Sequence, residues 1–349
     1  MNNAELINKL NIDKKLSYGE WLQLIESSTE ADRKFAADLA RKNTTARFGK
    51  RIYFRGIIEF TNICKNDCFY CGIRRSNKNV SRYRLLPEEI LECCAVGYGI
   101  GYRTFVLQGG EDAYWNDERL VSIVESIHKT YPDCAITLSV GEREKTSYEK
   151  LFAAGASRYL LRHETADEKH YGLLHPAEMS LSNRIQCLRN LKEIGFQTGA
   201  GMMVGAPYQT SKSLAEDMMF LTDFKPHMVG MGPFIPHKDT PFRNMPHGNA
   251  ELTLFLLSLT RLALPDVLLP ATTALGTIED EGRKQGVLAG CNVVMPNLSP
   301  MSVRKKYLLY DNKAGVESDA EESLNILKLQ MKEIGYEVVT GRGDFAEGE

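Results

Sequence analysis

The 349-residue chain has the composition of an ordinary globular protein, with 43% hydrophobic and 25% charged residues, and is long enough for one large or two small domains. A net charge of -2 and a pI near 6.4 give no electrostatic reason to expect nucleic acid as a partner. No apolar run is long enough to span a bilayer, and the first five residues lack the features of a signal peptide. We therefore expect a cytoplasmic protein without a membrane partner, whose eight cysteines are reduced or bind metal.

The first part of the chain has a helical pattern. Between about residues 4 and 46, apolar side chains such as Leu22, Ile25 and Leu39 recur at helical spacing, and Ser17 is a candidate N-cap. We expect residues 1–49 to form an N-terminal helical cap that precedes the main domain.

From residue 50 to about 310, apolar strand-like runs alternate with amphipathic helical stretches. Eight such repeats indicate parallel strands joined by helices, so we predict an α/β fold, a (β/α)8 barrel of the TIM type. An open barrel of six strands is the alternative. A last helix, 320–334, would pack outside the barrel as part of a C-terminal helical extension, 311–349. The predicted strands are 52–60, 104–107, 135–139, 158–161, 198–204, 228–231, 267–270 and 292–295.

The barrel prediction also says where chemistry should occur, because the active sites of such barrels lie at the carboxyl ends of the strands. Polar, charged or small residues follow every predicted strand, and a shared mouth explains them more simply than eight coincidences. Beyond the first strand, these segments are 108–112, 139–142, 162–165, 199–205, 232–237, 271–274 and 296–297.

Three cysteines follow the first predicted strand. Cys64, Cys68 and Cys71 have the spacing C-x3-C-x2-C, and thiolates are the usual ligands of iron-sulfur clusters. Three of them would hold three irons of a four-iron cluster and leave one iron free for chemistry. Structural zinc is the alternative, but it normally takes four protein ligands, and the next cysteines, Cys93 and Cys94, lie in a predicted helix. A disulfide is less favoured still.

Two further segments have competing interpretations. Gly109 and Gly110 form either a tight turn or a bare backbone that a ligand can approach, and they do not complete a dinucleotide-binding fingerprint. Arg162, His163 and Glu164 end an apolar strand, where charges are seldom buried unless they are paired or used; a surface salt-bridge cluster is the alternative. The histidines show no ligand-like spacing, so none is assigned to a metal.

The cysteine spacing, with an aromatic residue just before the last cysteine, resembles the signature of radical S-adenosylmethionine (SAM) enzymes. The resemblance implies that the free iron chelates the amino and carboxylate groups of SAM. It also implies that Glu164 contacts SAM and that the planar fork of Arg184 binds its carboxylate. The full set of implied SAM-binding residues is Tyr70, Gly109, Gly110, Glu111, Ser139, Glu164, Arg184, Met203 and Val204.

Within this superfamily, the order of motifs between about residues 50 and 310 resembles the FeFe-hydrogenase maturase family HydE. That resemblance implies reductive cleavage of SAM to a 5'-deoxyadenosyl radical, which acts on a cysteine-bound iron carbonyl cyanide complex. A partner maturase would make this complex, and an electron donor would bind transiently. The motifs are LQGGED (107–112), RYLLRHET (158–165), GAGMMVG (199–205), GPFIPH (232–237), PATTA (270–274) and VMPN (294–297). The substrate-cavity residues assigned on this basis are Thr137, Arg162, Thr272, Thr273 and Tyr307.

Other functions remain open at this point. A methylornithine synthase-like lysine mutase needs only the SAM cluster, and a non-catalytic iron-sulfur carrier or scaffold needs no SAM at all. Biotin synthase needs a second, sulfur-donating cluster inside the barrel. Cys134 and Cys291 fall at the beginnings of strands, away from the active site, which disfavours sulfur insertion.

Some HydE proteins bind a second cluster near the C-terminus, but residues 314–323 contain no cysteine, so we expect no second cluster there.

Overall fold

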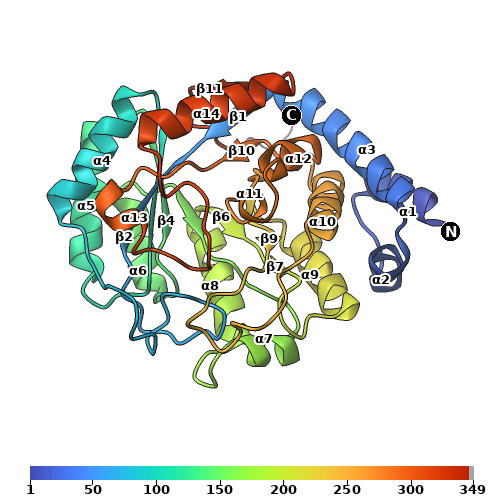
Figure 1. The fold of residues 1–349 in the computed structure, drawn as a ribbon, viewed down its shortest axis with the longest axis horizontal. Helices are drawn as coiled ribbons and strands as arrows, with labels where there is room; N and C mark the ends of the chain where they lie inside the picture. Colours follow the sequence, from blue (N-terminus) through green and yellow to red (C-terminus); the bar gives the residue numbers. More distant parts are fainter. Residues whose placement is uncertain (346–349) are drawn as a thin grey trace.

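The computed structural model describes residues 1–345. The N-terminal part of the chain forms three helices: α1 (Asn3–Asp13), α2 (Tyr18–Ser27) and α3 (Glu30–Phe48). Each begins with a capping box, and Ser17 caps α2 as predicted. The helices pack against the outside of the barrel, α3 on α10 (Ala250–Ala263) and α2 on α9 (Ser211–Phe224) (Figure 1). They therefore lie beside the barrel and not over its mouth.

The predicted TIM-type α/β barrel is confirmed. Its parallel strands run in the order β2-β3-β4-β5-β6-β8, while β1 lies between β10 and β11 and β7 pairs with β9. Isolated bridges continue the ring between these sheets. They join Met228 to Leu268, Pro270 to Val293 and Ile57 to Asn297. The strands are β1 (Arg51–Phe54), β2 (Gly56–Thr61), β3 (Thr104–Gly109), β4 (Ala135–Ser139), β5 (Arg158–Leu160), β6 (Gln197–Ala200), β7 (Met203–Val204), β8 (Met228–Val229), β9 (Gly232–Pro233), β10 (Val293–Val294) and β11 (Glu337–Val339).

The remaining helices surround these strands (Figure 1). The predicted last helix is confirmed as α14, which ends one residue earlier than expected. No described helix is both long and apolar enough to cross a membrane. The helices are α4 (Pro87–Gly99), α5 (Asp117–Thr130), α6 (Lys145–Ala153), α7 (Glu168–Leu174), α8 (Leu181–Ile194), α11 (Leu275–Ile278), α12 (Gly282–Leu288), α13 (Met301–Arg304) and α14 (Ala320–Glu333).

Several predicted strands are shorter or broken. The run 52–60 is interrupted at Arg55, and 198–204 is split into β6 and β7. The second break has a steric cause: Gly201 has φ +156°, and a Cβ there would lie 2.0 Å from the carbonyl oxygen of Gly230. The two neighbouring backbones approach so closely that only glycine fits. The predicted strand at 267–270 lies at its expected place in the ring but does not form a continuous strand, because it makes single parallel bridges at Leu268 and Pro270.

The tail after β11 closes the amino-terminal end of the barrel. There the Arg158 guanidinium, which is fully buried at the start of β5, donates to Asp344 Oδ1 at 2.7 Å. Arg55 is buried nearby, and burial together with repulsion from Arg158 lowers its pKa. Burial would raise the pKa of Asp344, but Arg158 and hydrogen bonds from Arg342 lower it to about 2. The carboxylate of Asp344 thus stabilises the buried positive charges of Arg158 and Arg55.

We expect Asp344→Ala to destabilise the protein by about 2 kcal/mol at neutral pH. Breaking a fully buried pair costs about 3–5 kcal/mol, and the partial exposure of Asp344 reduces this figure. Because folding lowers the pKa of Asp344, the stabilisation is complete above its ordinary value of 3.8 and is lost as the pH falls toward 2. Urea unfolding at pH 7 and pH 3 would measure both effects, with the exposed Asp13→Ala as control. Equal stability of the two variants at pH 7 would contradict this role.

Candidate active site at the mouth of the barrel

A cavity of about 280 Å³ opens at the carboxyl ends of the strands. It brings together most of the predicted site residues, which come from the cysteine loop after β2, from the ends of β3, β4 and β5, and from α8 and the 305–310 segment. The predicted residues that line it are Cys64, Cys68, Tyr70, Cys71, Gly109, Gly110, Glu111, Ser139, Arg162, Glu164, Arg184, Met203, Thr272 and Tyr307.

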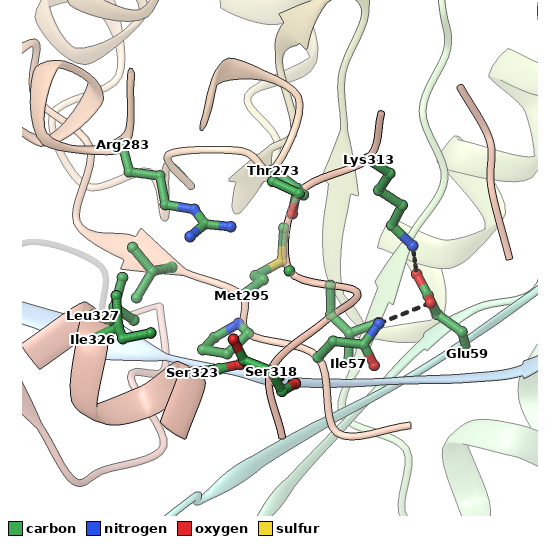
Figure 2. A pocket seen from close by; sticks show the side chains of 15 residues that line it. Ile57, Glu59, Thr273, Arg283, Met295, Lys313, Ser318, Ser323, Ile326 and Leu327 are labelled. Carbon is green, nitrogen blue, oxygen red and sulfur yellow. Dashed lines mark hydrogen bonds and ion pairs between the residues drawn. The ribbon is translucent and has the colours of Figure 1, made fainter. Parts of the chain in front are cut away.

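Three predicted residues do not line this cavity. Val204 is fully buried in the core. Thr137 precedes Ser139 by two residues on β4, so it points to the same side of the strand but one layer deeper. Its buried hydroxyl has no hydrogen-bond partner among the residues that the structure describes. Thr273 lines a separate cavity of about 200 Å³, where Lys313 pairs with the buried carboxylate of Glu59 (Figure 2).

The cysteine loop is held by polar contacts from Asp67 and Arg82. Asp67 Oδ1 accepts hydrogen bonds from Arg74 Nε at 2.8 Å and from the Ser76 amide at 3.0 Å. The hydrogen bond from Arg74 holds the pKa of Asp67 well below its usual range. Arg82 donates to the carbonyl groups of residues 62, 73, 74 and 77. The loop is therefore fixed while Cys64, Cys68 and Cys71 remain free, half-buried thiols.

Gly110 lets the end of β3 reach this loop. A Cβ at Gly110 would lie 2.3 Å from the carbonyl oxygen of Ile63 and 2.8 Å from Cys64 Cβ. The next amide, that of Glu111, points at Cys64 Sγ at 3.4 Å. Close packing on the cysteine loop therefore explains Gly110 in part, whether or not a ligand also approaches it.

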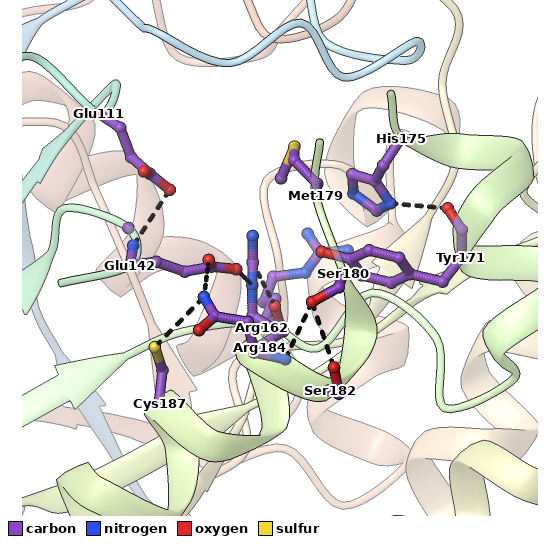
Figure 3. Close-up of polar contacts among 12 residues, drawn as sticks. Glu111, Glu142, Arg162, Tyr171, His175, Met179, Ser180, Ser182, Arg184 and Cys187 are labelled. Carbon is purple, nitrogen blue, oxygen red and sulfur yellow. Dashed lines mark hydrogen bonds and ion pairs between the residues drawn. The ribbon is translucent and has the colours of Figure 1, made fainter. Parts of the chain in front are cut away.

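Charged residues form a second wall of the cavity (Figure 3). Arg184 Nε donates to Glu142 Oε1 at 2.5 Å, and Arg184 Nη1 donates to the carbonyl oxygen of Arg162 at 2.8 Å. Burial alone would lower the pKa of Arg184, but Tyr171 and Glu142 raise it well above its usual range. The guanidinium is therefore a permanent, oriented cation beside the cysteine loop.

Glu164 reaches the cavity through an unusual backbone conformation. Its φ of +68° is rare for a residue with a side chain, and such strain concentrates at functional sites. Hydrogen bonds to the neighbouring segment stabilise this strained conformation: Glu164 N donates to Gly201 O at 3.0 Å, and Gly201 N donates to His163 Nδ1 at 3.2 Å. Its Oε2 pairs with Arg162 Nη2 at 2.9 Å, but within residues 1–345 this buried oxygen accepts no well-formed hydrogen bond.

Comparison with known proteins identifies the family to which this chain belongs. The model of the radical SAM superfamily matches residues 58–221. The [FeFe] hydrogenase maturase subunit HydE of Thermotoga maritima is 48% identical over 284 residues, which cover 81% of this chain and 80% of that protein. This chain belongs to the HydE family of the radical SAM superfamily. It is therefore an enzyme that cleaves SAM, and its family implies a [4Fe-4S] cluster.

Two other relatives are more distant from this HydE-family chain. The 3-methylornithine synthase of Methanosarcina acetivorans is 29% identical over 289 residues, which cover 82% of this chain and 80% of that protein. The crystal structure of methylornithine synthase (PylB) is 25% identical and aligns with a TM-score of 0.81 over 96% of this chain and 97% of that one. This chain thus shares its barrel fold with methylornithine synthase, while its sequence is more similar to HydE.

The three thiols fit an iron-sulfur cluster better than a single zinc ion. Within residues 1–345, no three His, Cys, Asp or Glu side chains are grouped as ligands of one metal ion. A cluster does not require such a group, because each cysteine binds a different iron. Burial raises the pKa of all three thiols, that of Cys71 to about 12 with a further contribution from Cys64. Cationic iron would supply the charge that keeps them deprotonated.

Tyr70 is oriented by a histidine that the sequence analysis did not assign. His175 Nδ1 lies 3.0 Å from the Tyr171 carbonyl oxygen, so this nitrogen carries the proton, and Nε2 accepts from the Tyr70 hydroxyl at 3.2 Å. Burial and the nearby Arg184 lower the pKa of His175 to about 3. His175 is therefore a neutral acceptor that fixes the Tyr70 ring beside the cysteines.

Glu142 is the other functional candidate that was not assigned. It follows β4 within a segment predicted to line the mouth, so the sequence indicated a position near the site. Its role could not be predicted, because it depends on contact with Arg184. That contact joins residues 42 positions apart. His175 gave no signal, since its partner Tyr70 lies 105 positions away.

We expect Cys68→Ala to abolish cluster binding while the barrel stays folded. The half-buried thiol lines the cavity and makes a weak contact with Met179 Sδ at 3.9 Å, so its removal deletes a ligand and costs little structural stabilisation. Iron content and visible absorbance after anaerobic reconstitution would measure the loss. The matched control is Cys134→Ala, which removes a buried thiol at the start of β4. A full complement of iron in Cys68→Ala would refute the ligand assignment.

Proposed function

We propose that this HydE-family enzyme delivers a 5'-deoxyadenosyl radical to a cysteine-bound iron carbonyl cyanide complex, as a step in assembling the hydrogenase H-cluster. One observation carries the proposal: the cysteine loop and the charged wall line a single cavity, which Thr272 and Tyr307 also line, in a chain 48% identical to a HydE maturase. The cluster would supply the one-electron reduction that cleaves the sulfonium of SAM into methionine and the radical. We also propose that only Cys64, Cys68 and Cys71 hold it, which leaves one iron for SAM.

The charged wall is suited to the methionyl end of SAM. Glu164 has a buried oxygen without a good hydrogen bond, and an ammonium group would satisfy it. Arg184 presents a planar fork to a carboxylate, while Glu142 keeps the fork in place. Tyr70, Gly109, Gly110, Glu111, Ser139 and Met203 line the same cavity, and we propose them as further SAM contacts.

The part of the cavity lined by Arg162, Thr272 and Tyr307 is suited to an anionic organometallic substrate. Arg162 Nη2 pairs with Glu164 Oε2 at 2.9 Å, whereas its buried Nε has no hydrogen-bond partner within residues 1–345, so Nε can donate to cyanide or carboxylate groups. Thr272 and Tyr307 line the same space. A lysine substrate would bring an ammonium group toward this cation, which disfavours the mutase function of the methylornithine synthases. Thr137 lies one layer deeper and would take part only if the substrate extends into the barrel.

The wider assignments are part of the same proposal. The organometallic substrate would come from a partner maturase, and a transient donor would supply the electron. We propose no second cluster, since the cysteine-free segment 314–323 lines the cavity of Glu59 and Lys313 instead. Residues 50–310 would form the catalytic barrel, with 1–49 and 311–349 as extensions.

Arg184→Ala should weaken SAM binding by about 1.5–3 kcal/mol, roughly tenfold to a hundredfold in Kd, because one charge-assisted contact is lost. The measurement is SAM titration of the reconstituted, oxidised enzyme. Arg189→Ala is the matched control, since it removes an exposed arginine from the same helix. The proposed contact would be excluded by an unchanged Kd in Arg184→Ala.

The substrate is tested by an anaerobic turnover assay. The reconstituted, reduced enzyme is given SAM with the iron carbonyl cyanide cysteine complex, with lysine, or alone, and 5'-deoxyadenosine and adenosylated products are quantified. We expect the complex to stimulate SAM cleavage and to carry the adenosyl group on its sulfur. Consumption of lysine without any effect of the complex would instead assign a mutase.

A further inference from the structure

A shallow basic groove lies beside the cysteine loop. It has a volume of about 530 Å³ and is formed by two segments, 76–79 and 238–243. Lys78, Lys238 and Arg243 are exposed in it, and none forms an ion pair with a residue between 1 and 345. Among the described residues of its lining, only Asp239 is acidic, and Asn79 Nδ2 donates to it at 2.7 Å. We call this surface the basic groove.

The first wall of the basic groove is bonded directly to the cysteine loop. The amide and hydroxyl groups of Ser76 both donate to Asp67, at 3.0 and 2.8 Å, and Asp67 lies between Cys64 and Cys68. Asn77 Nδ2 donates to the carbonyl oxygen of Gly72 at 2.7 Å. This wall is therefore continuous with the segment that carries the three thiols.

The second wall meets the same loop from the other side. Gly72 follows Cys71, and a Cβ on it would lie 2.4 Å from His237 Cδ2. His237 is buried and directly precedes Lys238. The two walls of the basic groove thus both contact Gly72, the residue after Cys71, so a molecule seated in the groove lies outside the cavity and beside the segment that carries the thiols.

The charge of the basic groove is a local feature. The whole chain has a net charge of -2, yet three unpaired cations gather within two short segments. Lys65 and Arg75, also exposed on the cysteine loop, pair with Glu111 and Glu178. A cationic patch on an otherwise weakly acidic protein attracts an acidic partner to one place and orients it there.

We propose that the basic groove is the docking surface for a small acidic one-electron carrier protein. The inference rests on the proposed function, because cleavage of SAM consumes one electron, which leaves the carrier and is finally accepted by the sulfonium. The cations are exposed and spread over an open hollow, which does not select a small anion. A weak, charge-steered contact of limited area is instead typical of redox encounters.

The test is binding of an acidic flavodoxin to the reconstituted enzyme, measured by calorimetry at low and high ionic strength. We expect the triple variant Lys78→Glu, Lys238→Glu, Arg243→Glu to raise Kd at least about tenfold at low salt and to flatten its salt dependence. The matching triple glutamine variant should give an intermediate effect and guards against disturbance of the fold. The control triple, Lys42→Glu, Lys129→Glu, Lys328→Glu, places the same charge change on exposed positions of α3, α5 and α14 and should leave Kd unchanged.

A second arm separates the docking surface from the proposed function. With dithionite as reductant, the groove variants should cleave SAM at the wild-type rate, whereas with reduced flavodoxin they should be slow. Equal flavodoxin Kd values for the groove triple and wild type, or an equal loss in the control triple, would overturn the docking proposal. Wild-type enzyme that binds flavodoxin through the groove but cleaves no SAM even with dithionite would instead overturn the proposed function.

Discussion

Close contact between the cysteine loop and the end of β3 determines the arrangement of the whole site. The loop has no regular secondary structure, so its thiols can be placed only by contacts with the barrel. Gly110 allows the β3 backbone to touch Ile63 and Cys64, and Asp67 and Arg82 hold the loop by polar contacts. The barrel thereby holds an irregular loop of ligands against the end of β3, at the end where such barrels carry their chemistry.

The charged wall depends on this placement. Arg184 and Glu164 lie on separate elements, yet both face the space beside the cysteines because the backbone at Glu164 turns to positive φ. Each charge has a neighbour of opposite sign, Glu142 for Arg184 and Arg162 for Glu164, so the wall is nearly neutral before any ligand binds. A zwitterion such as the methionyl group of SAM can then bind by exchanging these contacts, without bringing a net charge into a buried site.

The sequence predicts this architecture well where the signal is local. Apolar runs between amphipathic helices predicted the barrel, and cysteine spacing predicted the loop. The breaks in the strands were missed because they arise from tertiary approach, as at Gly201 and Gly230. His175 and Glu142 escaped assignment for the same reason, since each acts through a partner distant in the chain. Thr273 was expected beside Thr272, but it lines a different cavity, a separation that sequence patterns do not encode.

We propose that three cysteines leave one iron open to SAM beside Glu164 and Arg184. Electron-nuclear double resonance of the reduced, reconstituted enzyme tests it most directly, using SAM isotopically labelled at its amino nitrogen and carboxylate oxygens. We expect hyperfine coupling of both labelled groups to the cluster spin, because both would be ligands of the open iron. A cluster signal that SAM leaves unchanged, with no coupling to either label, would contradict it.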